Sequence, residues 1–309
     1  MITLDIKKKP FKQRWKKYRN FYFYVSPWII GFSLFTIIPM IFSLIVSFTD
    51  ATALTLFSDK IGFINLDNYK LIFMNDPDFI KSISNTLIYA VFRTFFVIVL
   101  SLAMAMLVFK LPGSKLLRTF AYLPSVIPIV GAALIWQLLF DTNASVFNNL
   151  LVSIGLNPIE FSSYDNALSS VIFMSVWTGI GPTMIIFTAA IAQVPEDLLE
   201  SAEIDGANKW QKFSRIILPL IVPNILFVAI TGMISGLQAY AEMDLLFGGG
   251  PGDATITMTM QVVGNMYADS VKGFGYACAQ SWVIFLIVMV FTVIFFALNK
   301  KYMFYGEEK

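Results

Sequence analysis

Hydrophobic residues in this chain gather into six long runs that are separated by more polar connections. A transmembrane helix needs about 20 mostly apolar residues to cross a hydrocarbon core of about 30 Å, and each run reaches that length. The pattern therefore predicts an all-α membrane protein with about six transmembrane helices. The predicted spans are Phe21–Phe48, Leu87–Phe109, Phe120–Phe140, Leu168–Ile191, Ile216–Gln238 and Ala277–Leu298.

Lysine and arginine side chains are concentrated in alternate connections. Eight lie before the first run, three in each of the connections that follow the second and fourth runs, and three after the last run. The other connections carry only four, which are Lys60, Lys70, Lys81 and Lys272. Because cytoplasmic loops carry the excess of positive charge, we expect both termini to lie in the cytoplasm.

The chain is expected to divide into four parts. Residues 1–20 form a basic cytoplasmic tail, 21–82 the first transmembrane helix and an outer loop, 83–298 a core of five transmembrane helices, and 299–309 a second cytoplasmic tail. The outer connection, Asp50 to Ser84, is rich in turn residues and is expected to hold one short surface helix. The basic tail directly precedes a membrane span, which favours an anchor to membrane lipid over an arm that binds nucleic acid.

Composition supports a membrane environment and argues against several kinds of catalytic site. Hydrophobic residues make up 57% of the chain and charged residues 14%, whereas soluble domains are about 25% charged. The chain has no histidine and a single cysteine, Cys278. It therefore lacks a histidine base, a Ser-His-Asp triad and the thiolates of a metal cluster. We expect neither a catalytic residue nor a metal site.

The connection from Gln193 to Ala207 has the pattern of a short helix outside the bilayer. Pro195 suits the first turn of a helix, where its missing N–H costs nothing. Glu196 and Asp197 then lie where the helix dipole favours negative charge. Gly206 is placed to end the helix in a left-handed conformation.

The polar face of this predicted helix is acidic. Helices that rest on a membrane surface usually carry lysine and arginine on that face. A protein partner is therefore a better interpretation than a membrane surface. The acidic residues are Glu196, Asp197, Glu200, Glu203 and Asp205.

The same connection contains a longer pattern: Glu200-Ser201-Ala202, three residues, Gly206, nine residues, and then Ile216-x-Leu218-Pro219. It resembles the EAA loop of the permease subunits of ATP-binding-cassette (ABC) importers, with Ser201 in place of an alanine. In that family the loop, here residues 193–219, docks on a cytoplasmic ATPase and transmits ATP-driven closure to the membrane helices. The resemblance implies this coupling role for Glu200, Ser201, Ala202, Asp205 and Gly206.

Residues elsewhere resemble the carbohydrate-uptake branch of these permeases, which includes the maltose and glycerol-3-phosphate permeases. They are Leu66-Asp67-Asn68-Tyr69, Asn85-Thr86, Tyr122-Leu123-Pro124, Gly249-Gly250-Pro251 and Gly275-Tyr276-Ala277. The resemblance implies a type I ABC importer permease fold in the bacterial cytoplasmic membrane, and a sugar or oligosaccharide as substrate. It also implies three kinds of partner: a second homologous permease chain, two ATP-binding cassette subunits and an extracytoplasmic solute-binding protein. The chain has no GxxxxGK[ST] motif, so ATP and Mg are expected on the partner ATPase, with no cofactor in this chain.

Polar and helix-breaking residues in or beside the runs are candidates for a substrate pathway. Arg93, the only cation inside a run, could reach the outer surface, pair with an acidic group, or face the pathway and favour an acidic saccharide. The Gly179-x-Gly181-Pro182 pattern is expected to loosen the fourth helix and free backbone carbonyls. The alternative for each position is helix–helix packing. The candidates are Arg93, Trp177, Thr178, Gly179 and Pro182, together with Gln238, Tyr240, Glu242 and Asp244 at the end of the fifth helix.

Other functions fit this membrane protein less well. A secondary transporter often has internal repeats and acidic residues within its spans, and neither is found in this sequence. An intramembrane enzyme would need a base or paired carboxylates at membrane depth, and the runs supply neither. A permease for a non-sugar or acidic solute stays open as an alternative.

Overall fold

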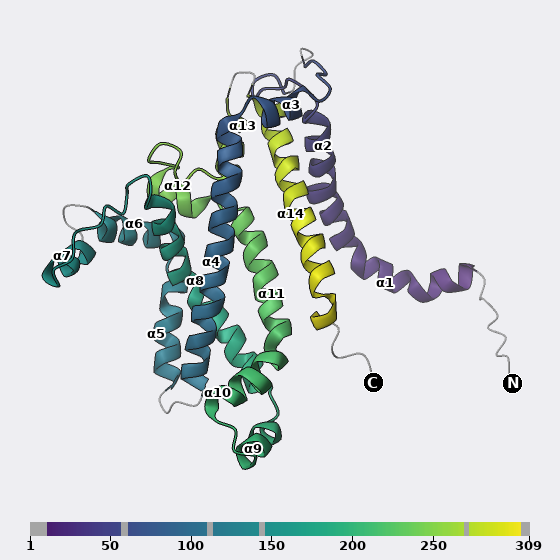
Figure 1. The fold of residues 1–309 in the computed structure, drawn as a ribbon. Coiled ribbons are helices and arrows are strands. Elements are labelled where there is room, and N and C mark those ends of the chain that lie inside the picture. Colours follow the sequence, from purple (N-terminus) through teal and green to yellow (C-terminus); the bar gives the residue numbers. More distant parts are fainter. Residues whose placement is uncertain (1–10, 57–60, 110–113, 142–145, 269–271, 304–309) are drawn as a thin grey trace.

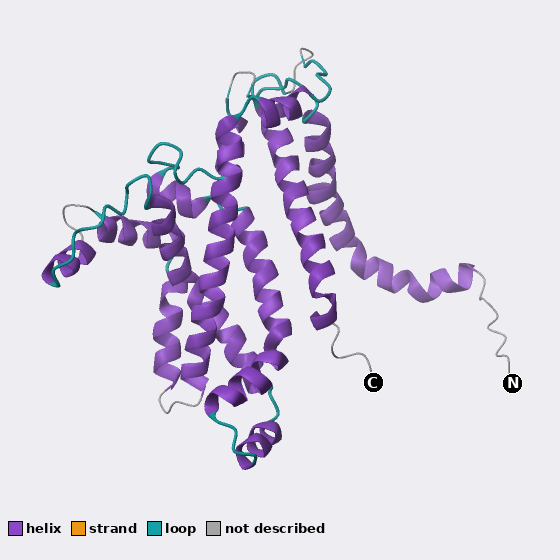
Figure 2. Cartoon of the chain, in the orientation of Figure 1, coloured by secondary structure: helices purple, strands orange, loops and turns teal. Residues whose placement is uncertain are grey.

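The computed structural model describes residues 11–56, 61–109, 114–141, 146–268 and 272–303, which are helical for the most part (Figure 2). Within these ranges no strand is found, only one antiparallel bridge between Thr49 and Phe63. Parts of both predicted tails, residues 1–10 and 304–309, lie outside the described residues, as do Lys60 and Lys110 of the predicted connections. Residues 11–20 belong to the first helix and do not form a separate tail.

The helices follow one another along the whole described chain (Figure 1). Two short segments, η1 and η2, are π-helical. The elements are α1 (Phe11–Phe32), η1 (Ser33–Ile37), α2 (Ile38–Val46), α3 (Asp67–Met74), α4 (Pro77–Phe109), α5 (Ser114–Val126), α6 (Ile129–Phe140), α7 (Val146–Ser153), α8 (Ala167–Ala192), α9 (Glu196–Ile204), α10 (Lys209–Lys212), η2 (Phe213–Ile217), α11 (Leu218–Leu237), α12 (Ala241–Phe247), α13 (Met258–Met266) and α14 (Phe274–Met303).

Among the described residues, five helices are long and apolar enough to cross a membrane, and α5 with α6 makes a sixth span if the pair counts as one. This number agrees with the prediction of about six. The third predicted span, Phe120–Phe140, is nevertheless not a single helix, because α5 and α6 meet at an angle of 96°. Pro128 explains the break: it cannot donate a backbone hydrogen bond, and it drives the residue before it out of the helical conformation.

The second span begins earlier than the hydrophobic pattern indicated. Helix α4 starts at Pro77, ten residues before Leu87, so the predicted outer loop to Ser84 is too long. The first ten residues of α4 include the polar residues Asp78, Lys81 and Ser82, so they do not belong to the apolar run that marks the span. The short surface helix predicted in that loop is present as α3.

Helix α4 is central to the molecule and packs against both α8 and α11. Glycines allow these helices to approach closely. A Cβ at Gly181 of α8 would lie 2.5 Å from a backbone oxygen of α5, and one at Gly236 of α11 would lie 2.7 Å from the Cα of Ala90 in α4. The Gly179-x-Gly181-Pro182 segment, which was expected to loosen the fourth helix, does not break α8, and its two glycines lie in close helix contacts.

A glycine-rich loop between α12 and α13 is fixed to the start of α4. The side-chain amide of Asn85 donates to the backbone oxygens of Asp253 at 2.9 Å and Ile256 at 3.1 Å. The hydroxyl of the next residue, Thr86, accepts a hydrogen bond from the N–H of Met258. Both α4 side chains are buried, so they hold the loop as a rigid feature at this end of the bundle.

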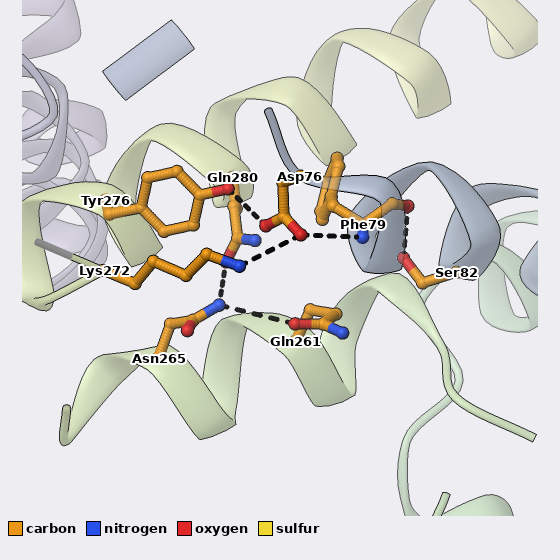
Figure 3. Close-up of polar contacts among 8 residues, drawn as sticks. All are labelled: Asp76, Phe79, Ser82, Gln261, Asn265, Lys272, Tyr276 and Gln280. Atoms are coloured by element: carbon orange, nitrogen blue, oxygen red, sulfur yellow. Dashed lines mark hydrogen bonds and ion pairs between the residues drawn. The ribbon is translucent and has the colours of Figure 1, made fainter. Parts of the chain in front are cut away.

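A buried carboxylate joins the start of α4 to α14 and to the connection before α14, near the same end (Figure 3). The Asp76 side chain is fully buried, accepts a hydrogen bond from the Tyr276 hydroxyl at 2.5 Å, and pairs with the Lys272 ammonium at 3.0 Å. It also accepts the N–H of Phe79 in the first turn of α4. Burial alone would raise the pKa of Asp76, but the hydrogen bonds from Tyr276 and Lys272 outweigh it and hold that pKa below its ordinary value.

The first span, Phe21–Val46, is only loosely attached to the rest. Its C-terminal end packs on α14, where Val46 is buried with Cys278 and the Trp282 indole donates to Ser43. Most side chains of its other half are exposed, and Figure 1 shows α1 diverging from the bundle. The π-segment η1 ends just before Pro39, whose missing N–H interrupts the helical hydrogen bonds at this point.

Candidate functional site

The connection between α8 and α11 folds into the short helix that its sequence predicts. Helix α9 begins directly after Pro195, which caps it and does not lie in its first turn as expected. Gly206 has a φ of +80° and ends the helix in the left-handed conformation. The N–H of Gly206 bonds to the oxygen of Glu203, and the N–H of Ala207 bonds to that of Ala202. The chain therefore turns sharply after α9.

A second helical start follows this turn. The side chain of Asn208 accepts the N–H of Gln211 at 2.9 Å, and the Gln211 side chain accepts the N–H of Asn208 at 2.8 Å. This reciprocal capping box fixes the start of α10, which continues through η2 into α11. The spacing Asn208-x-x-Gln211 is a local sequence signal for this capping box.

Helix α9 projects from the end of the molecule opposite α3 and α13 (Figure 1). It has no buried residue, and Leu199 is one of the residues packed against the core cluster of α4, α8 and α11. Ile204 is 87% exposed. The helix thus presents acidic and apolar side chains outward, as a docking element would. Of the predicted coupling residues, Ala202 is half-buried, and the exposed ones are Glu200, Ser201, Asp205 and Gly206.

The candidates in α8 face different surroundings. Trp177 packs edge-on against Trp136 at 5.5 Å and lines an apolar cavity of about 680 Å³ between α4 and α8. Gly179 lies against Val97 of α4. The Thr178 hydroxyl donates to the Ser175 oxygen of its own helix, and Pro182 is exposed. These four residues therefore do not form one polar surface within this chain.

Arg93 lies near the middle of α4, beside a polar group that sequence reasoning missed. The Tyr89 hydroxyl, one turn away, donates to Ser175 of α8 at 2.9 Å. Arg93 and Glu242 of α12 both lie near Tyr89. The structure thus brings Arg93 and Glu242 to one region. Tyr89 and Ser175 gave no signal of their own, because isolated tyrosine and serine residues are common in transmembrane helices.

Sixteen residues, about 24 Å at 1.5 Å per residue, separate Arg93 from the start of α4 at Pro77. Because α4 has 33 residues and is longer than the membrane core, this distance does not fix the depth of Arg93 in the membrane. The Nε of Arg93 is buried and has no hydrogen-bond partner among the described residues. An ion pair or a position facing a solute fits this burial better than a position at the outer surface.

The other four candidates for the substrate pathway were expected at the end of the fifth helix, but they lie beyond its last residue. Helix α11 ends at Leu237, and Gln238 and Tyr240 lie in a turn before α12, which contains Glu242 and Asp244. The Gln137 side chain of α6 donates to backbone oxygens of α12 and holds it in place. Gln238 and Asp244 are exposed, whereas Tyr240 and Glu242 are half-buried. The turn presents polar groups at the end of α11, where a solute could meet them.

The family of the chain follows from its similarity to known proteins. A family model described as the binding-protein-dependent transport system inner membrane component matches residues 97–302, well over half of the chain. The chain belongs to this family. The match begins within α4 and includes the whole of α9.

Several relatives of this permease are similar over nearly their full lengths. The probable ABC transporter permease protein YesP of Bacillus subtilis is 32% identical over 93% of each chain. The multiple sugar-binding transport system permease protein MsmF of Streptococcus mutans is 30% identical over 93% of this chain and 97% of its own. The lactose transport system permease protein LacF of Rhizobium radiobacter is 30% identical over 91% and 95%, respectively.

A solved structure has the same fold. It is the crystal structure of a bacterial alginate ABC transporter in complex with an alginate pentasaccharide-bound periplasmic protein. One of its chains superimposes on this permease with a TM-score of 0.78, at 25% identity, covering 95% of this chain and 98% of the other. The predicted type I ABC importer permease fold is confirmed, and the molecule is a multi-pass membrane protein. The orientation of its termini stays a prediction.

Proposed function

We propose that this permease imports a sugar or oligosaccharide across the bacterial cytoplasmic membrane, driven by ATP hydrolysis on separate subunits. The observation that carries the proposal is helix α9, which stands outside the bundle with exposed carboxylates and an exposed Ile204. A helix of this kind needs a protein partner, because exposed apolar and acidic groups side by side fit neither lipid nor water alone. The proposed partner at α9 is an ABC ATPase.

The sugar as substrate is supported by the relatives. The names of MsmF and LacF refer to multiple sugars and lactose, and both proteins are similar to this chain over more than nine-tenths of it. The remaining proposed partners are a second homologous permease chain and an extracytoplasmic solute-binding protein. The proposed orientation places both termini and α9 in the cytoplasm, since the connection that contains α9 is among the basic ones.

An acidic oligosaccharide is a second candidate substrate. Arg93 supports it, because a cation near the middle of a membrane helix with an unpartnered Nε can attract a carboxylate. The chain of the alginate transporter, with its acidic oligosaccharide, has the same fold. The proximity of Glu242 argues the other way, since it offsets part of the charge of Arg93.

Reconstitution of the full complex in liposomes tests the proposal. Radiolabelled lactose, arabino-oligosaccharides and alginate oligosaccharides are offered with the cognate binding protein, with ATP or without it. We expect ATP-dependent uptake by the complex, and neither uptake nor ATP hydrolysis by the purified chain alone. Uptake that persists when the ATPase subunits are omitted would indicate a secondary transporter and refute the proposal. Arg93→Gln distinguishes the substrates, because it should reduce uptake of alginate oligosaccharides more than uptake of lactose.

A further inference from the structure

An ion pair connects α9 to the helix that leads into the membrane span. The Lys212 ammonium donates to the Glu203 carboxylate at 2.8 Å. Glu203 is the next-to-last residue of α9, and Lys212 is the last residue of α10. The two residues therefore lie on opposite sides of the turn that contains Gly206.

The position of Glu203 is unusual for an acidic residue. The carboxyl end of a helix carries partial negative charge, so a carboxylate there is unfavourable unless a cation offsets it. Lys212 supplies that cation at the same helix end. Its side chain is only 19% exposed, whereas that of Glu203 is 73% exposed. The Lys212 ammonium therefore binds within the loop and is not freely available to an outside partner.

Helix α9 lies at the surface of the molecule. The helix has no buried residue, and Leu199 is its apolar contact with the core cluster that also receives Phe213. A Cβ at Gly206 would meet nothing within 4 Å, so the turn itself has open space around it. The capping box at Asn208 fixes where α10 begins but not the angle at which α9 leaves it.

We propose that the Glu203–Lys212 ion pair is a positioning element that makes α9 move as one unit with α10 and α11. The inference rests on the proposed coupling role of α9. Residues 209–237 form one continuous helical span. A displacement of α9 therefore moves this span only if the angle between α9 and α10 stays constant. The ion pair fixes that angle. Without it, part of the movement of α9 would be absorbed in the turn at Gly206.

Spin labels on α9 and α11 test this inference in the full complex. Cysteines replace Glu196 in α9 and Leu220 in α11, both exposed, and the buried Cys278 is replaced by alanine. Double electron–electron resonance then measures the distance between the labels, with and without a non-hydrolysable ATP analogue. The same preparations show whether the ATPase subunit copurifies.

With the wild-type ion pair, the two spin labels should show one narrow distribution of distances, which the ATP analogue does not change. Glu203→Gln and Lys212→Met should each add a second, longer distance that grows with the analogue, while the ATPase subunit still copurifies. An ion pair as exposed as Glu203–Lys212 changes the ratio of the two orientations of α9 by up to about fivefold. The double variant should be no worse than either single variant, since both remove the same interaction. Lys212→Arg should restore the single distance.

Lys209→Met is the matched control, because Lys209 is an exposed cation at the start of the same short helix. It should behave as the wild type. The inference is overturned if Glu203→Gln and Lys212→Met keep a single distance, if their effects add in the double variant, or if either variant releases the ATPase subunit. A wild-type chain that copurifies with no ATPase subunit would instead refute the proposed function itself.

Discussion

Replacement of Asp76 by asparagine should destabilise the permease by an amount that its contacts define. Asparagine keeps the shape but removes the charge that pairs with Lys272, and its amide nitrogen cannot accept the hydrogen bonds now made by the carboxylate. Breaking a buried ion pair costs about 3–5 kcal/mol. Lys272 is 36% exposed, so its ammonium can return to water. We therefore expect a smaller cost for Asp76→Asn, about 2–3 kcal/mol, in line with the loss of hydrogen bonds to a charged group.

Removal of the cation should destabilise the permease more than removal of the carboxylate does. Lys272→Met leaves the Asp76 carboxylate buried without a cation, and we expect a cost of about 3–5 kcal/mol. The double variant removes both charges and should cost less than the sum of the two. The matched control is Lys70→Met, since Lys70 pairs with Asp67 at 2.8 Å but both side chains are more than 60% exposed. That pair should contribute less than about 1 kcal/mol.

Thermal unfolding of the purified chain in detergent, followed by tryptophan fluorescence, measures these differences. For a chain of this size, 1 kcal/mol corresponds to a shift of roughly 2 °C in Tm. Asp76→Asn should therefore lower Tm by about 4–6 °C, with Lys272→Met lower still. The reasoning is refuted if Lys272→Met unfolds at the same temperature as Lys70→Met, or if it is milder than Asp76→Asn.

The same carboxylate predicts a dependence of stability on pH. The pKa of Asp76 is below its ordinary value in the folded protein, so the folded state favours the ionised form. Its contribution to stability is complete above the unfolded pKa of about 3.9, and it is lost as the pH falls towards the lower folded pKa. The Tm of the wild type should fall more steeply between about pH 5 and pH 3 than that of Asp76→Asn, which lacks this group. Equal slopes would contradict this assignment.

Three further predictions concern the coupling loop, helix packing and topology. Gly206→Asp should reach the membrane at normal levels but lose transport and its copurifying ATPase, because it adds a charge to an acidic turn and a Cβ where φ is +80°. Gly181→Ala should cost about 1–3 kcal/mol, measured as a lower Tm, because its Cβ would meet a backbone oxygen of α5 at 2.5 Å. Reporters fused after residue 110 and after Lys301 should score cytoplasmic, and those within residues 141–165 external.

The two substitutions have their own controls. Gly206→Asn tolerates the left-handed conformation better than other residues and should keep most of the transport activity. Gly264→Ala places a Cβ where nothing lies within 4 Å, so its Tm should match that of the wild type. Normal transport by Gly206→Asp would remove the coupling role from this loop. A reversed reporter pattern would show that the number of crossings is wrong.

Much of the fold could be predicted because lipid imposes a simple rule on the sequence. A run of apolar residues long enough to cross the membrane must be a helix, since every backbone group has to be bonded within it. The predicted start of the second span and the predicted single helix of the third span were wrong, because that rule gives no information at these places. Polar residues at the start of α4 are stabilised by the glycine-rich loop and by the Asp76 cluster, which are contacts across the fold. The break at Pro128 lies within a run that is apolar and long enough to be taken as one span.

The candidate sites differ in how far the sequence could define them. The loop around α9 is governed by local signals, such as Pro195 before the helix and Gly206 after it, and these act over a few residues. The region around Arg93 is assembled from α4, α8 and α12, so no local pattern could join Tyr89, Ser175 and Glu242. The Glu203–Lys212 pair lies between these cases: nine residues separate the two charges, and only the turn at Gly206 brings them together.

The loose attachment of the first span bears on which sequence changes the permease can tolerate. Most side chains of this span are exposed as far as Ile45, whereas Val46 is buried against α14. An exposed side chain has no fitted neighbour whose shape it must match, so only its hydrophobicity is under selection within this chain. Exchanges among phenylalanine, leucine, isoleucine and valine should therefore be almost neutral at the exposed positions and costly at Val46. A deep mutational scan that recorded equal intolerance at both would mean that another molecule packs against the exposed positions in the cell.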